Sequence, residues 1–193
     1  MLVYSPCHLD FADFDTERDA IIARAKENGI GAMVTIATRV TQFNRVLSVA
    51  EAYPQVFCSV GTHPHNADEE LDVTVEELVR LADHPKVVAI GETGLDYFYD
   101  HAPREAQAQG LRTHIAASRQ TGLPLVIHAR DADDDLAAIL SDEMGKGIFP
   151  FVLHCFSSGR RLAEVGVELG GYVSFSGILT FRKSEELRAI ARD

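Results

Sequence analysis

The chain has 193 residues, of which 46% are hydrophobic and 24% are charged. This length and balance are typical of one globular domain, and they exclude a collagen-like repeat and a largely disordered chain. The 18 basic and 29 acidic residues give a net charge of −11. That charge argues against a broad basic surface for duplex nucleic acid but leaves room for a local phosphate site.

Export and membrane insertion find no support in the sequence. The apolar runs fall short of the ~20 residues that a spanning helix needs, and the N-terminus lacks the basic and apolar parts of a secretory signal. The three cysteines, Cys7, Cys58 and Cys155, have no paired spacing, which is typical of reduced thiols. We therefore expect a cytoplasmic protein without membrane contact, and we expect its cysteines to be buried.

Apolar runs rich in β-branched residues alternate along the whole chain with segments of helical period, which predicts a parallel α/β fold. We expect these strands to be buried on both faces. In chain order they are residues 2–5, 32–37, 56–60, 87–91, 125–127, 151–153 and 172–176.

Helix signals lie between the expected strands. Residues 43–53 place apolar side chains on one stripe, and Thr74 with Glu77 forms a capping box. The acidic run 131–135 is suited to a helix start, and residues 184–193 have helical composition up to the last residue.

About seven strand–helix units are expected, one fewer than a closed barrel has. The predicted fold is α/β: a (β/α)₈ TIM-barrel-like single domain over residues 1–193, truncated after about seven βα units, with the last unit missing. The rival is a doubly wound open sheet, which usually has a glycine-rich turn after its first strand. No such turn occurs here. Without an eighth unit, the first and seventh strands would keep open edges, so we expect self-association.

Histidines and one carboxylate follow the expected strands, whose ends meet at one face of a barrel. They are His8 after the first strand, His63 and His65 after the third, Glu92 after the fourth, His128 after the fifth and His154 after the sixth. Imidazoles with one carboxylate favour a divalent cation such as zinc, iron or manganese. If two ions bind, Glu92 is the natural bridge, because a carboxylate has two oxygens.

The other histidines carry no expected role. His84, His101 and His114 fall in predicted helices or loops, and we assign them to the surface.

Several motifs carry a resemblance to a known family. They occur in order along the chain: residues 7–11 (CHLDF), 61–65 (GTHPH), 91–97 (GETGLDY), 123–132 (LPLVIHARDA), 154–157 (HCFS) and 173–177 (VSFSG). With them the chain resembles the TatD-related deoxyribonucleases, metal-dependent hydrolases of the amidohydrolase-like TIM-barrel group.

The resemblance implies a site with one or two divalent ions, without distinguishing zinc, manganese and magnesium. Glu92 would bridge, His128 and His154 would hold one ion, and His8 would help to hold the other; Glu92, His128 and His154 would form the catalytic core. The implied reaction is hydrolysis of DNA phosphodiesters in single strands or at ends, including 3′–5′ exonuclease activity.

The resemblance also implies roles around the ions. His63, His65 and Asp96 would orient the ligands or the substrate. Arg130 would meet a phosphate, for which a planar guanidinium is well shaped.

Two departures from the family pattern weaken one ion site. Tyr4 and Pro6 stand at the first two positions of an Asp-x-His-x-His pattern, and no aspartate follows an eighth strand. Glu92, His128 and His154 would still provide three ligands and an open position, as catalytic zinc sites do.

Two alternative functions stay open. One is a catalytically degenerate scaffold that binds one metal or none. The other is a related amide or lactone hydrolase, although those relatives often carry a carboxylated lysine where Glu92 stands.

The aromatic run Tyr97, Phe98 and Tyr99 also has two interpretations. The rings either stack on a nucleobase, as in single-strand binders, or pack the loop.

Overall fold

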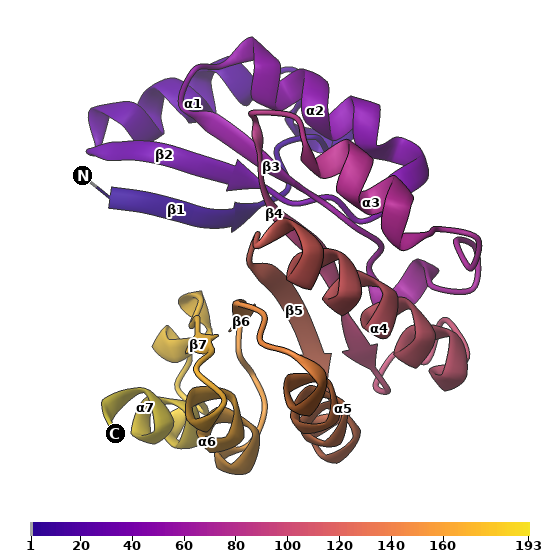
Figure 1. Ribbon diagram of the computed structural model, residues 1–193. Helices are drawn as coiled ribbons and strands as arrows, with labels where there is room; N and C mark the ends of the chain where they lie inside the picture. The colour runs from indigo at the N-terminus through magenta and orange to yellow at the C-terminus, as the bar shows by residue number, and fades with distance from the viewer. Residues whose placement is uncertain (1) are drawn as a thin grey trace.

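The computed structural model of the protein describes residues 2–193, with the side chains of Ser5 and Pro6 outside the description. Seven parallel strands form one curled sheet in the order β1 to β7, so each strand pairs with its neighbour in sequence (Figure 1). The strands are β1 Leu2–Cys7, β2 Ile30–Thr35, β3 Val56–Val60, β4 Val87–Asp96, β5 Leu125–Arg130, β6 Phe151–Leu153 and β7 Tyr172–Val173. The predicted TIM-barrel-like α/β architecture is confirmed.

The α-helices lie on the outer side of the curled sheet (Figure 1). They are α1 Arg18–Glu27, α2 Phe43–Ala52, α3 Val75–Ala82, α4 Arg104–Thr121, α5 Asp133–Lys146, α6 Arg160–Glu168 and α7 Glu185–Arg192. Four 3₁₀ turns, η1 Ala12–Phe14, η2 Val40–Gln42, η3 Pro64–Asn66 and η4 Gly177–Thr180, lie in the connections. None of the helices in residues 2–193 has the length and hydropathy of a bilayer-spanning segment.

Local signals place the helices as predicted. The Thr74 hydroxyl caps α3 by accepting the backbone N–H of Glu77. On α2, Phe43, Val46 and Val49 are buried in the main hydrophobic core, as the apolar stripe requires.

The two central strands are longer than their apolar runs predict. β4 continues through Glu92 to Asp96, and β5 continues through His128 to Arg130. Glu92 and His128 therefore lie within strands and do not follow them, which corrects the expected boundaries. The ladder shifts register between Ile90 and Thr93 and then resumes, with Gly94 opposite His128.

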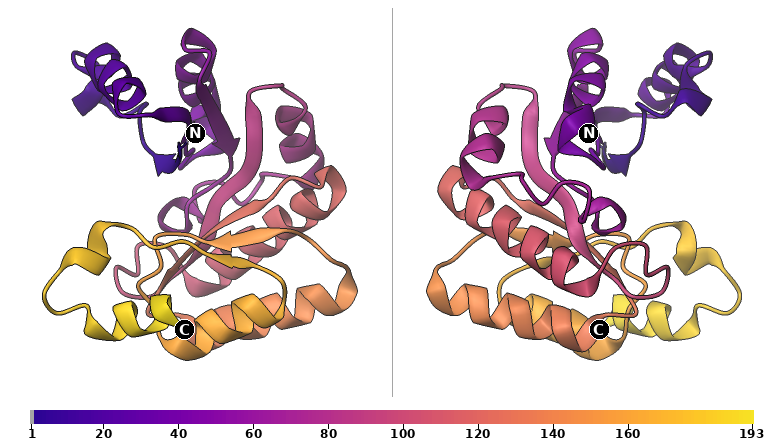
Figure 2. Two further views of the ribbon diagram at one scale, coloured as in Figure 1. Left: turned by 90° about the vertical axis from the view of Figure 1, so that its left-hand side faces the viewer. Right: turned by 90° about the vertical axis from the view of Figure 1, so that its right-hand side faces the viewer.

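The edge strands differ from the prediction of strands buried on both faces. On β1, Leu2, Val3 and Tyr4 are 64%, 59% and 53% exposed, and Tyr172 on β7 is 77% exposed. Each of these strands has one neighbour in the sheet, and the first and last strands lie at its two edges (Figure 2). The open edges expected from the sequence are therefore present. In addition, the β1–β2 ladder shifts register between Tyr4 and Cys7, an interval that contains Pro6, whose backbone has no N–H to donate to the ladder.

The cysteines are unpaired, as expected, but not all are buried. Cys58 is buried, Cys7 is half-buried and Cys155 is exposed. Burial raises the pKa of the Cys7 and Cys58 thiols to about 12, which makes both unreactive at neutral pH.

His114 corrects the prediction that it lies at the surface, because its side chain is only 1% exposed on α4. Its Nε2 accepts the backbone N–H of Thr62 at 3.0 Å, and its Nδ1 donates to the Gly110 carbonyl at 2.7 Å. A polar side chain on a helix predicts solvent exposure, but here both ring nitrogens are hydrogen-bonded inside the protein. The ring thereby fixes the turn that leads from β3 to His63.

The neutral state of His114 gives a pH-dependent stability. Burial lowers its pKa from 6.5 to about 4, against smaller opposite effects of the hydrogen bond to the Gly110 carbonyl and of the Glu70 charge. The unfolded chain then binds the proton more strongly than the folded chain, so stability is lost as pH falls from 6.5 towards 4. From pH 7.5 to pH 5, the free energy of unfolding measured in urea should fall by on the order of 2 kcal/mol more for wild type than for His114→Gln. Parallel pH profiles for the two proteins would contradict a neutral, buried His114.

Candidate metal centre

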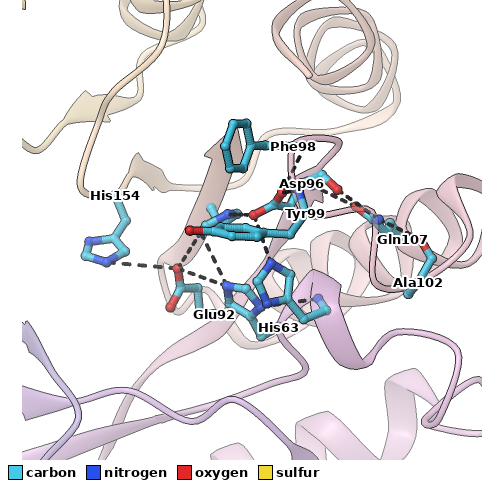
Figure 3. A network of polar contacts seen from close by, with 10 residues as sticks. His63, Glu92, Asp96, Phe98, Tyr99, Ala102, Gln107 and His154 are labelled. Atoms are coloured by element: carbon cyan, nitrogen blue, oxygen red, sulfur yellow. Dashed lines mark hydrogen bonds and ion pairs between the residues drawn. The ribbon is translucent and has the colours of Figure 1, made fainter. Parts of the chain in front are cut away.

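One oxygen of Glu92 is the meeting point of three imidazoles. Glu92 is 3% exposed on β4. Its Oε1 lies 3.1 Å from Nδ1 of His128 and 3.9 Å from Nε2 of both His63 and His154 (Figure 3). These side chains come from β5, from the turn after β3 and from the end of β6, so the curled sheet gathers residues that are far apart in sequence.

Asp96, at the end of β4, is a second buried carboxylate. Its Oδ2 lies 2.9 Å from Nε2 of His65 and 2.9 Å from Nε2 of His128. The Gln107 side chain accepts the backbone N–H of Asp96 and donates to its carbonyl, which anchors this strand end to α4. Sequence reasoning missed Gln107, which is 1% exposed.

The turn after β3 holds two of the histidines. The His63 backbone N–H donates to the Thr38 carbonyl, and the Asn66 side chain donates to the same oxygen. Pro64 begins η3, and the His65 backbone N–H donates to Nδ1 of His63. These contacts orient both rings towards β4.

His8 stands apart from Glu92. Its Nδ1 lies 3.2 Å from the Ile36 carbonyl, and its ring stacks on Phe11 with centroids 4.8 Å apart. As Nδ1 donates to that carbonyl, Nε2 keeps its lone pair. Of the two residues that replace the first positions of the Asp-x-His-x-His pattern, Tyr4 has an exposed side chain. The side chain of Pro6 lies outside the described residues.

An open cavity of about 420 Å³ unites most of these groups. Its lining includes six residues expected from the sequence, His8, His63, His65, Glu92, His128 and His154, together with Phe11, Thr38 and Asn66. Sequence reasoning gave these three no role, although Phe11 ends the quoted motif 7–11, Asn66 follows the motif 61–65 and Thr38 follows an expected strand. Asp96 and Arg130 do not line the cavity. Asp96 instead contacts two histidines that do, His65 and His128.

The buried charges are held ionised by the histidines. Burial raises the pKa of Glu92, but the hydrogen bond from His128 and the electrostatic interaction with the nearby imidazoles outweigh it and lower that pKa to about 2. Burial likewise raises the pKa of Asp96, and the Tyr99 N–H together with His65 and His128 lowers it to about 2.

The imidazoles differ in protonation. Burial lowers the pKa of His63 to about 3 and also lowers the pKa of His154, so both are neutral at pH 7. Burial opposes charge on His128 as well, but its hydrogen bonds to Glu92 and Asp96 raise its pKa.

This donor set fits a divalent cation. Two ionised carboxylates, Glu92 and Asp96, contact the imidazoles, and none of the described residues that line the cavity is lysine or arginine. His154 has a buried Nδ1 without a hydrogen-bond partner. One ring nitrogen each from His63, His65 and His128 lies within 4.8 Å of the others. Tetrahedral zinc ligands lie about 3.3 Å apart, given bonds of about 2.0 Å, so only small movements separate this arrangement from a coordinated one.

The profile of the family described as "TatD related DNase" matches residues 5–193. The chain belongs to this family. As a member, it is a hydrolase with the family's barrel-like fold. It is 38% identical over 194 residues to "Uncharacterized metal-dependent hydrolase YcfH" of Escherichia coli K12, covering 99% of this chain and 72% of the relative. It is 32% identical over 196 residues to "Uncharacterized metal-dependent hydrolase YabD" of Bacillus subtilis, covering 100% and 75%.

Solved structures agree with this assignment. The crystal structure of YjjV, a TatD homologue from E. coli K12, superposes with a TM-score of 0.87 at 31% identity, covering 98% of this chain and 73% of that one. A TatD family hydrolase from Entamoeba histolytica, with a TM-score of 0.85 at 23% identity and coverage of 100% and 69%, supports the fold.

Gly94 allows the close approach of β4 and β5 that positions the centre. Its φ is +149°, and a Cβ there would lie 2.0 Å from the His128 carbonyl oxygen. Gly94→Ala should therefore cost at least about 2 kcal/mol in urea unfolding and weaken metal binding by displacing His128. Gly29→Ala is the matched control, because Gly29 has φ +83° but no atom within 4 Å of the added Cβ. Equal losses in the two variants would show that the contact with β5 is unimportant.

Proposed function

We propose that the protein is a metal-dependent hydrolase of nucleic-acid phosphodiesters. The observation that carries the proposal is the convergence of His63, His128 and His154 on the buried carboxylate of Glu92. The description of the family as DNases supports the choice of substrate, and the relatives named metal-dependent hydrolases support the choice of cofactor.

In this proposal Glu92, His128 and His154 hold one divalent ion, and His8 with Glu92 contributes to a second. A bound cation would supply Lewis-acid activation of water and of the phosphoryl group. His63 lies as close to Glu92 as His154 does, so it is a further ligand candidate. The donor set accommodates zinc or manganese better than magnesium, because its nitrogens outnumber its carboxylates.

The chain's own residues have separable tasks. Glu92 stays ionised and provides the central negative charge, while His63 and His154 stay neutral and keep lone pairs available. Asp96 contacts Nε2 of both His65 and His128 and so fixes two rings at once. The open cavity admits a phosphodiester beside these groups.

The substrate form is proposed from charge and shape. A net charge of −11 disfavours wrapping around a duplex, whereas a local site suits a single strand or an end, and 3′–5′ exonuclease action is consistent with that access. A cytoplasmic location is proposed on the cysteines, which are all unpaired.

Substitution of Glu92 tests the function. Glu92→Gln keeps the shape but removes the charge, so bound metal per chain and hydrolysis of a labelled single-stranded DNA should each fall at least about 100-fold. The matched control is Glu143→Gln, the same change at a buried glutamate that contacts Arg112, Arg119 and Lys146 on the outer helices. Metal analysis and a strand-cleavage assay with and without chelator provide the readouts. Unchanged turnover after chelation, or in Glu92→Gln, contradicts the proposal, and a metal-free, inactive wild type would favour the degenerate scaffold.

We also propose that the open edge of β1 pairs with a second copy of the chain. Val3 is 59% exposed on this edge strand, between exposed Leu2 and Tyr4. Wild type should sediment as a concentration-dependent oligomer, and Val3→Lys should shift it to monomer, because charge on an edge opposes pairing. Val167→Lys is the control, since Val167 is 60% exposed but lies on α6. A wild type that stays monomeric across concentrations rules this out.

A further inference from the structure

Two large aromatic rings are exposed beside the metal centre. Phe98 and Tyr99 follow directly after β4 and are 55% and 49% exposed. Rings of this size are usually buried, and an exposed cluster of them next to a polar cavity marks a binding surface. Tyr97 differs, because it is half-buried, its hydroxyl donates to Asp135 and its ring lies under Arg104.

The two rings are held in place. The backbone N–H groups of Phe98 and Tyr99 donate to Oδ1 of Asp96 at 3.1 and 2.9 Å. The rings meet edge to face, with centroids 4.9 Å apart at 86°. The Arg130 guanidinium lies 4.2 Å from the Phe98 centroid and 5.0 Å from the Tyr99 centroid. A preorganised surface binds a flat ligand with a small entropic cost.

The same carboxylate ties these rings to the metal centre. Asp96 contacts Phe98 and Tyr99 through Oδ1, and it contacts His65 and His128 through Oδ2. His65 lines the cavity and lies 5.3 Å, centroid to centroid, from Tyr99. The rings therefore stand one side chain away from the cavity (Figure 3).

Arg130 adds positive charge where the protein as a whole is acidic. Among the described side chains, its guanidinium has no hydrogen bond or ion pair, and it lies over the two rings. Its five N–H donors stay available for a phosphate or a base edge, while the rings provide the cation–π contact that holds it.

We propose that Phe98, Tyr99 and Arg130, here called the aromatic platform, bind an unpaired nucleobase next to the phosphodiester in the cavity. Stacking needs a base that has left its pair, so the platform selects single strands and frayed ends over intact duplex. The inference rests on the proposed function for the identity of the substrate. It adds the residues that recognise the base and predicts that an abasic substrate binds poorly.

The test measures binding separately from cleavage. A single-stranded oligonucleotide with 2-aminopurine at its end is titrated with protein in EDTA, so that fluorescence reports stacking without turnover. A second oligonucleotide, identical except for an abasic end and labelled elsewhere, provides the comparison. Wild type should bind the base-bearing strand about ten-fold more tightly than the abasic strand, and 2-aminopurine fluorescence should be quenched.

Substitutions assign the effect to the platform. Phe98→Leu and Tyr99→Leu keep apolar volume without a flat ring, so each should remove most of the preference for the base-bearing strand and leave binding of the abasic strand unchanged. Tyr172→Ala is the matched control, because Tyr172 is 77% exposed on the edge strand β7. Unchanged thermal unfolding and metal content confirm that the platform variants are folded.

The outcomes separate the two proposals. Base-dependent binding without strand cleavage in the presence of metal supports the platform and contradicts the proposed function. Cleavage of base-bearing and abasic strands at equal KM supports the function and overturns the platform. Quenching of 2-aminopurine fluorescence that persists in both leucine variants also overturns the platform. Equal affinity for single-stranded and duplex ends would overturn it as well.

Discussion

The structure depends on the burial of two carboxylates on one strand. Glu92 and Asp96 lie on β4, are 3% and 0% exposed, and are four residues apart. Burying a carboxylate in its charged form is costly unless hydrogen bonds or opposite charge compensate it. Here the compensation comes from imidazoles on neighbouring strand ends and from backbone N–H groups, which together keep both carboxylates ionised. The cavity is thus lined by an ionised carboxylate and several imidazoles, which are donors that suit a divalent cation.

The packing of β4 against β5 decides where those charges stand. Gly94 brings the two backbones together opposite His128, and the resumed ladder carries Asp96 to the level of Arg130. Because of this extension, one carboxylate contacts His65 and His128 on one side and the loop with Phe98 and Tyr99 on the other. The candidate metal ligands and the exposed rings are therefore positioned by the same carboxylate, Asp96.

The central strands of the sheet are buried, and its edge strands are more exposed. Val56, Ile90 and Leu125 on the central strands are fully buried, whereas the residues at the start of β1 are mostly exposed. His8 comes from that edge strand, and it contacts Ile36 and Phe11 in place of Glu92. The imidazoles nearest to Glu92 follow β3 and β6 or lie on β5, so the candidate centre depends less on β1 than on the other strands.

The sequence alone determined the alternation of strands and helices and the approximate strand positions, because hydrophobic period and capping residues such as Thr74 act over a few residues. It also singled out Glu92 and the histidines as candidates, since they recur after successive apolar runs and the motifs around them resemble one family. The tertiary structure alone decided that β4 and β5 run on through Glu92 and His128, because pairing between distant strands stabilises residues of low strand propensity. It also decided that His114 is buried with both nitrogens bonded, that Thr38, Asn66 and Phe11 line the cavity, and that Arg130 lies on Phe98 and Tyr99. Each of those facts depends on contacts between segments distant in the chain, which no local pattern encodes.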